Sequence, residues 1–296
     1  MEIIGNEKAV KLLDRIVATG KVSGAYLFIG PEGVGKLDAA KEFAGRLVDL
    51  TSSPQVGPKS SINPDLFIIE PEIEVKKGVT KKLDIKIGSM RELQRKMGLT
   101  GAGFKAAIIN EAEKMTRSAQ NAILKTLEEP NDKTVIILVS SNADKILPTI
   151  LSRCQKIRFS LVPDGIIRKR LPDTMDMQDI IFWSLGRPRI AKMMASDRAE
   201  LSRRQGLTSE LKAVLSGNIA EKFRLAEDWS KDREMVRKKL DLWVAIFRED
   251  MLGKPGAGVS PEKALLSIEA IASVLGTLRD TNANARLVLE NLFLKL

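Results

Sequence analysis

Residues 104–154 read FKAAIINEAEKMTRSAQNAILKTLEEPNDKTVIILVSSNADKILPTILSRC, and their pattern indicates the fold class of the chain. Lys105–Ala112 predicts a buried strand that ends in an acidic corner. Met115–Glu129 predicts an amphipathic helix that stops at a proline, with an apolar stripe formed by Ala119, Ala122, Ile123 and Leu127. Thr134–Ser140 predicts a second apolar strand, and Leu147–Cys154 begins a further helix.

The same alternation of helices and strands is present upstream of this stretch. Asn6–Thr19 predicts a helix and Gly24–Ile29 a short buried strand. Asp65–Glu70 predicts another strand, the charged segment Pro71–Lys82 a loop or hairpin, and Gly88–Met97 a helix. Strands that alternate with helices predict an α/β fold built on a doubly wound parallel sheet.

Strand signals stop after Pro163. Three short helices are expected at about residues 164–170, 176–185 and 187–196. A long helical region follows over Thr208–Leu296, with one clear break at Gly253–Gly258. After this break, Ser260 and Pro261 are favourable first residues for a new helix. The second half of the chain is therefore predicted to be all-α.

Composition excludes several classes of site. The 296 residues include one cysteine and no histidine, so an internal disulfide and a zinc site built on those ligands are not available. No apolar run approaches the ~20 residues of a membrane span. The first residues show no basic segment followed by an apolar core, so no secretory signal is expected. These features predict a soluble, cytoplasmic protein that does not interact with membranes.

The net charge of +10 comes from 48 basic and 38 acidic residues. Such a surplus raises the rate of encounter with nucleic acid or with an acidic partner. An ordinary solvated surface with a basic bias explains the charge equally well. No interleaving of aromatic and basic residues indicates single-strand stacking, so charge alone does not predict a DNA-binding module.

A glycine-rich turn connects the strand at Gly24–Ile29 to the next predicted helix. Its phosphate-binding residues would be Gly30, Gly33, Gly35 and Lys36. A strand, a glycine turn, a lysine and a helix form the context of a phosphate loop, in which backbone amides hold phosphates. The next position normally carries Ser or Thr for Mg²⁺, but here it is Leu37. An ordinary glycine turn is the alternative interpretation, and Lys36 would then be a surface lysine.

The tripeptide Ser152–Cys154 follows the second strand of the opening stretch by one short helix. This layout is typical of oligomeric P-loop ATPases, in which the arginine, here Arg153, serves the nucleotide of a neighbouring subunit. The alternative is that Arg153 forms an ion pair with a nearby carboxylate and has a structural role only.

The chain resembles, essentially end to end, the delta-prime subunits of the bacterial DNA polymerase III clamp loader, which belong to the AAA+ family. Asn121–Pro130 and Leu147–Gln155 carry the most specific similarity. Signatures of moderate specificity are found at Ala25–Phe28, Asn63–Asp65, Ile85–Leu93 and Asn282–Leu292.

This resemblance implies three domains: an AAA+ nucleotide-binding-like domain at 1–161, a helical lid at 162–205 and a helical collar at 206–296. It implies assembly with gamma/tau and delta subunits, and action on the sliding clamp and primer–template DNA through the complex. It also implies that Arg153 is a trans-acting arginine finger. Ser140 and Ser141 match the first sensor and Arg189 the second, and all three are sensors or remnants of sensors.

Three departures from the family pattern affect the expected mechanism. Thr51–Pro64 lacks the four-cysteine zinc module that the family often carries, so we predict no bound zinc. Leu37 replaces the loop hydroxyl, and Asn110 replaces the aspartate of the acidic corner. These two positions normally hold Mg²⁺, so Glu111, which would polarise water, has nothing to act on. We predict a subunit that binds ATP weakly at most and does not hydrolyse it.

Two other functions remain as alternatives. An active ATPase like the gamma/tau subunits would require Ser or Thr at position 37 and Asp at position 110. A stand-alone nucleic-acid-binding protein or nucleotide kinase would need neither the Ser152–Cys154 helix nor a helical collar.

Overall fold

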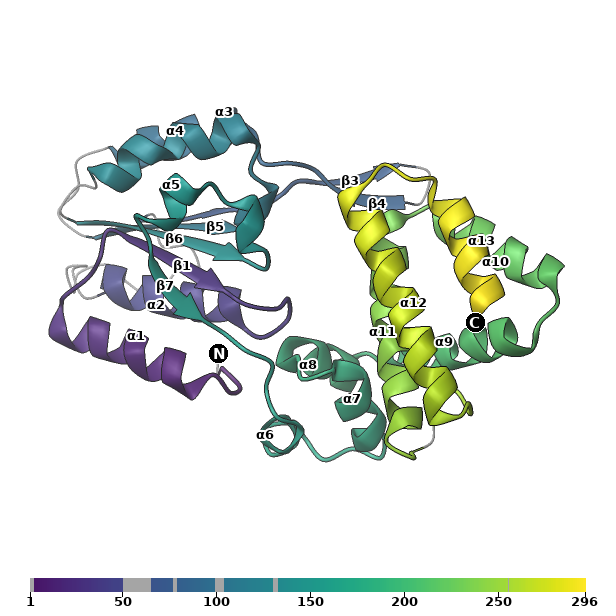
Figure 1. Ribbon diagram of the computed structural model, residues 1–296. Coiled ribbons are helices and arrows are strands. Elements are labelled where there is room, and N and C mark those ends of the chain that lie inside the picture. The colour runs from purple at the N-terminus through teal and green to yellow at the C-terminus, as the bar shows by residue number, and fades with distance from the viewer. Residues whose placement is uncertain (1–2, 50–64, 77–78, 99–103, 130–132, 255) are drawn as a thin grey trace. The chain divides into compact units, whose positions relative to one another are not determined.

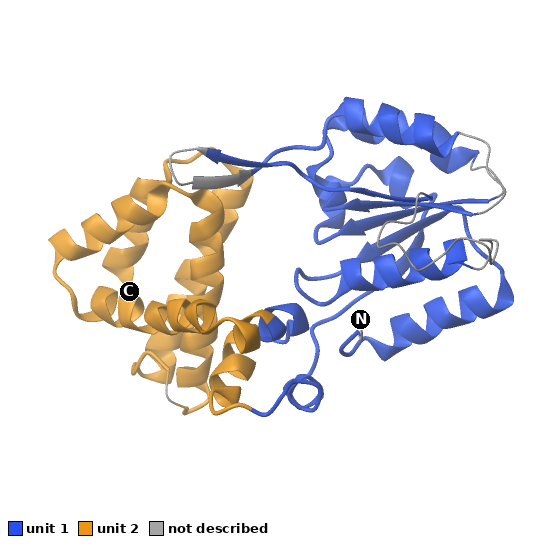
Figure 2. Cartoon of the chain, turned by 180° about the vertical axis from the view of Figure 1, so that it is seen from behind, with its two compact units in different colours: residues 1–173, 186–192 blue, residues 174–185, 193–296 orange. Residues whose placement is uncertain are grey.

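The computed structural model describes residues 3–49, 65–76, 79–98, 104–129, 133–254 and 256–296. The predicted loop Thr51–Pro64 and the helix-stopping Pro130 lie outside the described residues. The chain forms two compact units, one of residues 1–173 and 186–192, the other of residues 174–185 and 193–296 (Figure 2). Helix α8 (Pro188–Ser196) begins in the first unit and ends in the second.

The first unit is built on a five-stranded sheet in the order β2-β5-β6-β1-β7. Its strands are β1 (Ala25–Ile29), β2 (Leu66–Ile69), β5 (Lys105–Asn110), β6 (Thr134–Ser140) and β7 (Gln155–Arg158). Every adjacent pair is parallel, which confirms the predicted parallel sheet. Every residue of β6 is buried, as expected for a central strand covered on both faces.

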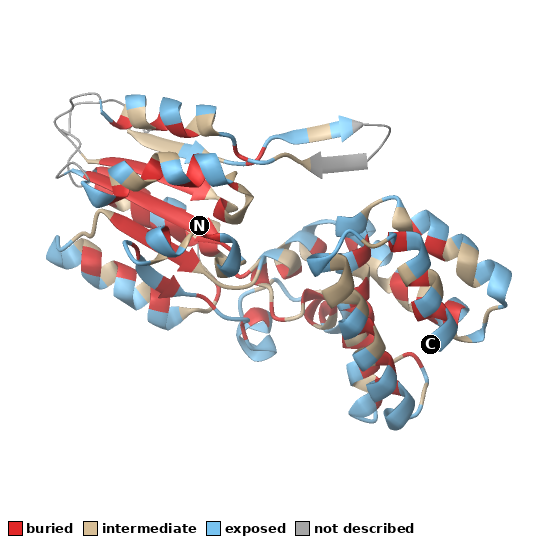
Figure 3. Cartoon of the chain, turned by 45° about the horizontal axis from the view of Figure 1, so that its top comes forward, coloured by how far each residue is buried: buried red, intermediate tan, exposed pale blue. Residues whose placement is uncertain are grey.

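Helices cover both faces of this sheet (Figure 1). Helices α1 (Glu7–Thr19) and α2 (Lys36–Asp49) pack on one face, and α3 (Ile87–Met97), α4 (Arg117–Glu128) and α5 (Pro148–Leu151) on the other. Successive residues of a strand point to opposite faces, so Tyr26 and Phe28 join the first core while Leu27 joins the second. Figure 3 shows the resulting pattern, with buried strands between helices whose outer faces are exposed.

The helices around Arg153 differ from the sequence prediction. The strand β5 is followed by a 3₁₀ turn, η1 (Ala112–Lys114), and α4 begins only at Arg117. Thr116 caps α4, because its side chain accepts a hydrogen bond from Ala119 N at 3.2 Å. A second 3₁₀ turn, η2 (Ala143–Lys145), precedes α5, which ends at Leu151. The prediction that Arg153 lies in a helix is therefore wrong, since this residue occupies the turn between α5 and β7.

Two short strands form a hairpin separate from the main sheet. Strand β3 (Ile73–Lys76) pairs antiparallel with β4 (Val79–Lys82), and Ile73 lies opposite Lys82. The sequence allowed a loop or a hairpin here, and the structure has the hairpin. Its last residue, Lys82, faces the acidic corner of the sheet, as described below.

The remaining helix of the first unit is α6 (Asp164–Arg168). All elements of secondary structure in the described part of the second unit are helices: α7 (Met177–Ser184), α9 (Arg198–Ser216), α10 (Ile219–Ser230), α11 (Arg233–Met251), α12 (Pro261–Asp280) and α13 (Ala285–Lys295). This confirms an all-α second half with its break before Ser260, whose side chain caps α12. Helix α9 runs across the boundary predicted between residues 205 and 206. The division into three domains stays a prediction.

An aromatic cluster forms the core of the second unit. Trp229, Trp243 and Phe293 come from α10, α11 and α13, with ring centroids 4.7 to 5.5 Å apart. The indole N–H of Trp243 donates to Leu207 O at 3.1 Å and so ties α9 to this cluster. These side chains are core residues, as expected from the apolar stripe of α11. Among the described residues, no helix has both the length and the apolar character that a membrane span requires.

Candidate functional site

The turn between β1 and α2 is a glycine loop at a topological switch point of the sheet. The connection after β1 leads to α2 on one face, whereas the connection after the adjacent β6 leads to α5 on the other. Ligands of open α/β sheets bind at such points. Gly30, Gly33 and Gly35 all have positive φ values, of 153°, 82° and 93°. A Cβ atom at Gly30 would lie 2.1 Å from Phe159 O, so no other residue fits there.

Lys36 is buried and bound to its own loop. Its Nζ donates to Gly30 O and to Pro31 O, both at 2.6 Å. Burial lowers the pKa of Lys36 to about 8, although the carboxylates of Glu113, Glu32 and Glu111 act in the opposite direction. The interpretation of Lys36 as a surface lysine is therefore wrong. The ammonium group lies inside the loop, where a phosphate would be held.

The two positions that normally hold Mg²⁺ are occupied by groups that do not fit this ion. Leu37 packs its side chain against the core shared by α1 and α2. The side chain of Asn110 donates through Nδ2 to Glu70 Oε1 at 3.0 Å. Mg²⁺ prefers carboxylate and other oxygen ligands in octahedral geometry, and neither position supplies a carboxylate or a hydroxyl. Among the described residues, no three carboxylate or thiol groups gather closely enough to hold a metal ion.

Glu111 is held by an ion pair that the sequence did not suggest. Its carboxylate accepts a hydrogen bond from Lys82 Nζ, at the end of β4. Both side chains are partly buried, so water screens this pair less than a surface pair. A carboxylate that acts as a base must be free to take a proton. The strand β4 therefore reaches the acidic corner and pairs with Glu111, the residue that the sequence analysis predicted would polarise water in an active ATPase.

The serines predicted as a first sensor are bound to neighbouring groups. Ser140 Oγ donates to Asn142 O at 3.1 Å, and the Ser140 carbonyl accepts from Gly30 N at 3.3 Å. Ser141 donates through its amide, at 3.1 Å, and through its hydroxyl to Glu113 Oε1. The end of β6 is thus joined to both the glycine loop and η1.

Arg189 is brought to the glycine loop by its backbone. Its N–H donates to Gly33 O at 3.0 Å, and the loop packs closely against the start of α8, since a Cβ at Gly33 would lie 3.2 Å from Arg187 Cβ. The Arg189 side chain is exposed. The structure therefore brings the predicted loop residues and the predicted second sensor to one end of the sheet.

Arg153 lies apart from these groups, in the turn after α5. Its Nη1 donates to Thr149 O at 2.8 Å, and its Nη2 pairs with Glu128 Oε1 at 2.6 Å. The next residue, Cys154, points into the core, and burial raises the pKa of its thiol to about 11. The buried thiol anchors the turn while the arginine stays on the surface. The ion pair anticipated as a structural alternative is present, and its partner is at the end of α4.

Gln120 fixes α5 to α4, and sequence reasoning missed it. Its side chain is buried, and Nε2 donates to Met115 O at 3.2 Å and to Lys145 O at 2.9 Å. Its Oε1 accepts from Leu147 N at 2.8 Å. A polar residue on the buried face of a predicted amphipathic helix was the available signal. The position of the arginine turn therefore depends on this one amide as well as on Glu128.

Comparison with known proteins places the chain in a family. The family model described as "DNA polymerase III, delta subunit" matches residues 5–163, more than half of the chain. DNA polymerase III subunit delta' of Bacillus subtilis is 29% identical over 268 residues, which cover 82% of this chain and 76% of that protein. Subunit delta' of Pseudomonas aeruginosa is 30% identical over 225 residues, covering 70% of this chain and 65% of that protein. The chain belongs to the DNA polymerase III delta' family of clamp-loader subunits.

Members of other clamp-loader families are similar as well. DNA polymerase III subunit tau of Bacillus subtilis is 32% identical over 187 residues, which cover 60% of this chain and 32% of tau. Among solved structures, a gamma subunit-related protein from Thermotoga maritima is 22% identical, with a TM-score of 0.49 and 97% of each chain covered. Thr51–Pro64, where the sequence analysis looked for a zinc module, lies outside the described residues, so the absence of zinc stays a prediction.

The buried lysine of the glycine loop should make anion binding depend on pH. Lys36 has a pKa of about 8 instead of its ordinary 10.5, so the positive charge is present below pH 8 and is lost above it. The affinity for a fluorescent ATP analogue should fall severalfold between about pH 7 and pH 9.5, a range in which an unperturbed lysine stays charged. Fluorescence anisotropy of the isolated protein measures this.

The matched control is Lys36→Met, which should bind weakly at every pH in this range. A wild-type affinity that stays constant over the range, or a variant that binds as well as the wild type, would contradict the role of Lys36.

Proposed function

We propose that this delta'-type subunit does not hydrolyse ATP, serves as a scaffold of the clamp loader, and supplies Arg153 in trans to a neighbouring ATPase subunit. The observation that carries the first part is the pair of residues at the Mg²⁺ positions. Leu37 is partly buried and packs against the core, and Asn110 is hydrogen-bonded to Glu70. In P-loop enzymes, the hydroxyl and the carboxylate at these positions hold the ion that bridges the phosphates.

Two further contacts support the loss of hydrolysis. The carboxylate of Glu111 is neutralised by Lys82, so it is not available to orient an attacking water. Lys36 keeps the geometry to hold a phosphate, since its Nζ lies within the glycine loop. Weak binding of ATP without turnover is the behaviour that this combination supports.

The contacts of Arg153 support its role as an arginine donor. Its side chain is about one third exposed, and Thr149 and Glu128 orient it through two of its nitrogens. A guanidinium has five N–H groups, so donors remain for a phosphoryl oxygen after these two contacts. Its charge is permanent and its donors form a rigid fork, which suits the charge that develops on a transferred phosphoryl group. Its partners lie on α4 and α5, not on the chain's own glycine loop.

The three-domain organisation is part of this proposal. Residues 1–161 would be the AAA+ domain, 162–205 the lid, and 206–296 the collar that assembles with gamma/tau and delta subunits. The collar role is supported by apolar side chains on the surface of α12, where Leu265 and Leu266 are 45% and 61% exposed. Sliding clamp and primer–template DNA would be engaged through the assembled complex.

An active ATPase like gamma/tau is the second candidate, because tau of Bacillus subtilis is 32% identical over 187 residues and delta' 29% over 268 residues. Leu37 and Asn110 argue against it, since both Mg²⁺ ligands are missing together. The discriminating observation is turnover by the isolated protein.

The isolated protein should show no Mg²⁺-dependent ATP hydrolysis. We expect turnover far below the usual enzyme scale of ~1 s⁻¹, with ATP, Mg²⁺ and primed DNA present, in a phosphate-release assay. Lys36→Ala serves as the control for contaminating activity. Steady turnover near that scale, abolished by Lys36→Ala, would show that the gamma/tau-like alternative is correct.

Substitution of Arg153 should affect the assembled complex and not the isolated chain. An arginine finger contributes ~10³–10⁵ to kcat at its own site. Because only one of several ATP sites would border this subunit, Arg153→Ala should lower total DNA-stimulated ATPase severalfold and slow clamp loading. Folding and complex assembly should be unchanged in thermal denaturation and size-exclusion chromatography.

Arg153→Lys tests whether charge alone is sufficient, and it should also be impaired because lysine lacks the fork of donors. Arg91→Ala, which removes an exposed arginine on α3, is the matched control. If complexes with Arg153→Ala hydrolysed ATP and loaded clamps at the wild-type rate, the role of Arg153 as an arginine donor would be wrong. Only the scaffold role would then remain.

The exposed leucines of α12 provide a test of the collar. Leu266→Asp should leave the melting temperature nearly unchanged, because surface substitutions usually alter stability by no more than ~0.5 kcal/mol. It should weaken association with gamma/tau and delta subunits, because it places a charge in an apolar interface. Leu12→Asp on α1 is the matched control. Co-elution of Leu266→Asp with the partner subunits at wild-type strength would contradict a collar contact at this face.

A further inference from the structure

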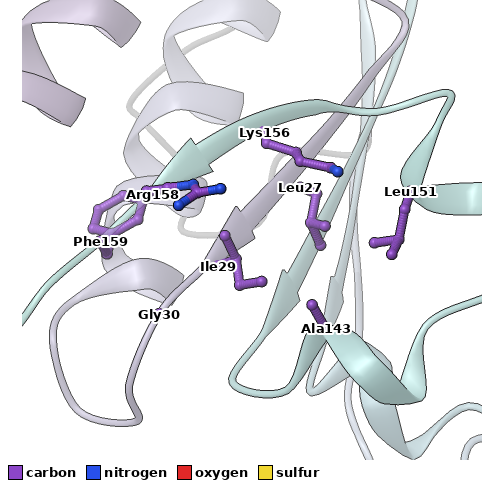
Figure 4. A pocket seen from close by; sticks show the side chains of 8 residues that line it. All are labelled: Leu27, Ile29, Gly30, Ala143, Leu151, Lys156, Arg158 and Phe159. Atoms are coloured by element: carbon purple, nitrogen blue, oxygen red, sulfur yellow. The ribbon is translucent and has the colours of Figure 1, made fainter. Parts of the chain in front are cut away.

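A hollow of about 330 Å³ opens on the sheet where β1 meets the edge strand β7 (Figure 4). We name it the β1–β7 hollow, and it is lined by Leu27, Ile29, Gly30, Ala143, Leu151, Lys156, Arg158 and Phe159. It lies on the sheet face that carries α3, α4 and α5, because Leu27, Ile29 and Leu151 belong to the core of that face. None of these residues belongs to the predicted nucleotide site except Gly30.

The hollow combines an apolar floor with a cationic rim. Leu27 lies directly opposite Lys156 in the β1–β7 register, and Ile29 lies opposite Arg158, so all four side chains are on one face. Figure 4 shows the two cationic side chains beside the leucine and isoleucine of β1. Both cations are exposed, and within the described part of the chain neither takes part in an ion pair.

The lining does not suit a phosphate group. Phosphate sites use backbone N–H groups as well as cations. The lining residue next to the loop, Gly30, already donates its N–H to Ser140 O at 3.3 Å. A phosphate in the hollow would therefore depend on the two side-chain cations, without the cluster of backbone N–H groups that a phosphate loop supplies.

The lining does not suit a nucleic-acid base either. Base recognition in single strands relies on stacking against an exposed aromatic ring. The Phe159 ring is buried and packs against Phe28, at 5.4 Å between centroids, in the core of the opposite sheet face. The described lining therefore presents no aromatic surface on which a base could stack.

We propose that the β1–β7 hollow receives an acidic segment of the neighbouring clamp-loader subunit, with an aliphatic side chain on its floor and a carboxylate between Lys156 and Arg158. Charge complementarity selects this occupant, because two exposed cations beside an apolar floor match a carboxylate next to a hydrocarbon side chain. Leu151 lines the hollow two residues before Arg153. A partner seated there would therefore lie against the arginine turn.

This inference rests on the proposed function, since it assumes that a subunit faces Arg153. According to this inference, the hollow determines the position of the neighbouring subunit, and Arg153 acts on the nucleotide that this neighbouring subunit holds. The two roles are separable, because Lys156 and Arg158 lie on β7 whereas the partners of Arg153 lie on α4 and α5.

Association kinetics with the purified gamma/tau-type subunit of the same organism test this proposal, by surface plasmon resonance at two salt concentrations. Lys156→Glu/Arg158→Glu should slow association about tenfold at low salt, and the difference should shrink as salt rises, because rim charges act mainly on the association rate. Ala143→Leu, which fills the hollow without changing charge, should raise the dissociation rate instead. Melting temperatures of both variants should match the wild type.

Lys8→Glu/Lys11→Glu on α1 makes the same change in net charge and should leave the association rate close to the wild type. If the charge-reversal variant of the hollow and the charge-reversal variant of α1 slowed association equally, only the total charge would matter and the hollow would have no specific role. Wild-type kinetics in both hollow variants would also overturn the proposal, and the cations would then serve only to keep the edge strand from pairing.

A further experiment measures the binding of ATP and of inorganic phosphate to the isolated chain. The substitutions in the hollow should not change either affinity. Loss of either in Lys156→Glu/Arg158→Glu would make the hollow an anion site and overturn the proposal. Failure of the proposed function is distinguishable, because a wild-type chain that bound no clamp-loader subunit would contradict both, whereas wild-type assembly with unaffected variants contradicts this inference alone.

Discussion

The structure of the first unit depends on the burial of β1, which lies between β6 and β7 in a parallel sheet and has four buried residues, Ala25–Phe28. Tyr26, Leu27 and Phe28 have no exposed surface, and β6 and β7 flank the strand. A strand in this position needs both edges paired and both faces covered. The chain leaves it through Gly30, which passes so close to the backbone of Phe159 that a side chain is excluded. The glycine loop and the β1–β7 hollow are both consequences of how this one strand ends.

Several charged and polar groups around the glycine loop are bound to other groups of the protein. Lys36 binds the carbonyls of its own loop, and Glu111 is paired with Lys82. Asn110 and the serines at the end of β6 are hydrogen-bonded to Glu70, Asn142 and Glu113. Such a network stabilises the end of the sheet, because most of its buried polar groups have a partner, Glu113 Oε2 being an exception. The proposed lack of hydrolysis rests on part of this network, in which the carboxylate of Glu111 is paired and Asn110 stands at a Mg²⁺ position.

Around α5 and β7, in contrast to the glycine loop, the cationic side chains are left on the surface. Arg153 is oriented by Glu128 and Thr149 but remains on the surface, and Lys156 and Arg158 are exposed on the edge strand. Gln120 and the buried Cys154 attach this region to the rest of the unit without using the cations. A subunit with a self-contained loop and an outward-facing cationic surface is suited to act on a neighbour. The proposed function rests on this contrast between the glycine loop and the surface around α5 and β7.

The sequence by itself determined the parallel sheet, the glycine loop, the all-α second half and the family. These depend on local signals: apolar runs of strand length, glycines that take positive φ, and helix caps such as Ser260. Strand β7 was missed because only Ile157 is buried in it, so it has no apolar pattern. The Lys82–Glu111 pair, the Gln120 bridge and the β1–β7 hollow join residues 25 or more positions apart. No local pattern encodes such contacts. They were decided by the tertiary structure, in which strand order and register determine which distant side chains meet.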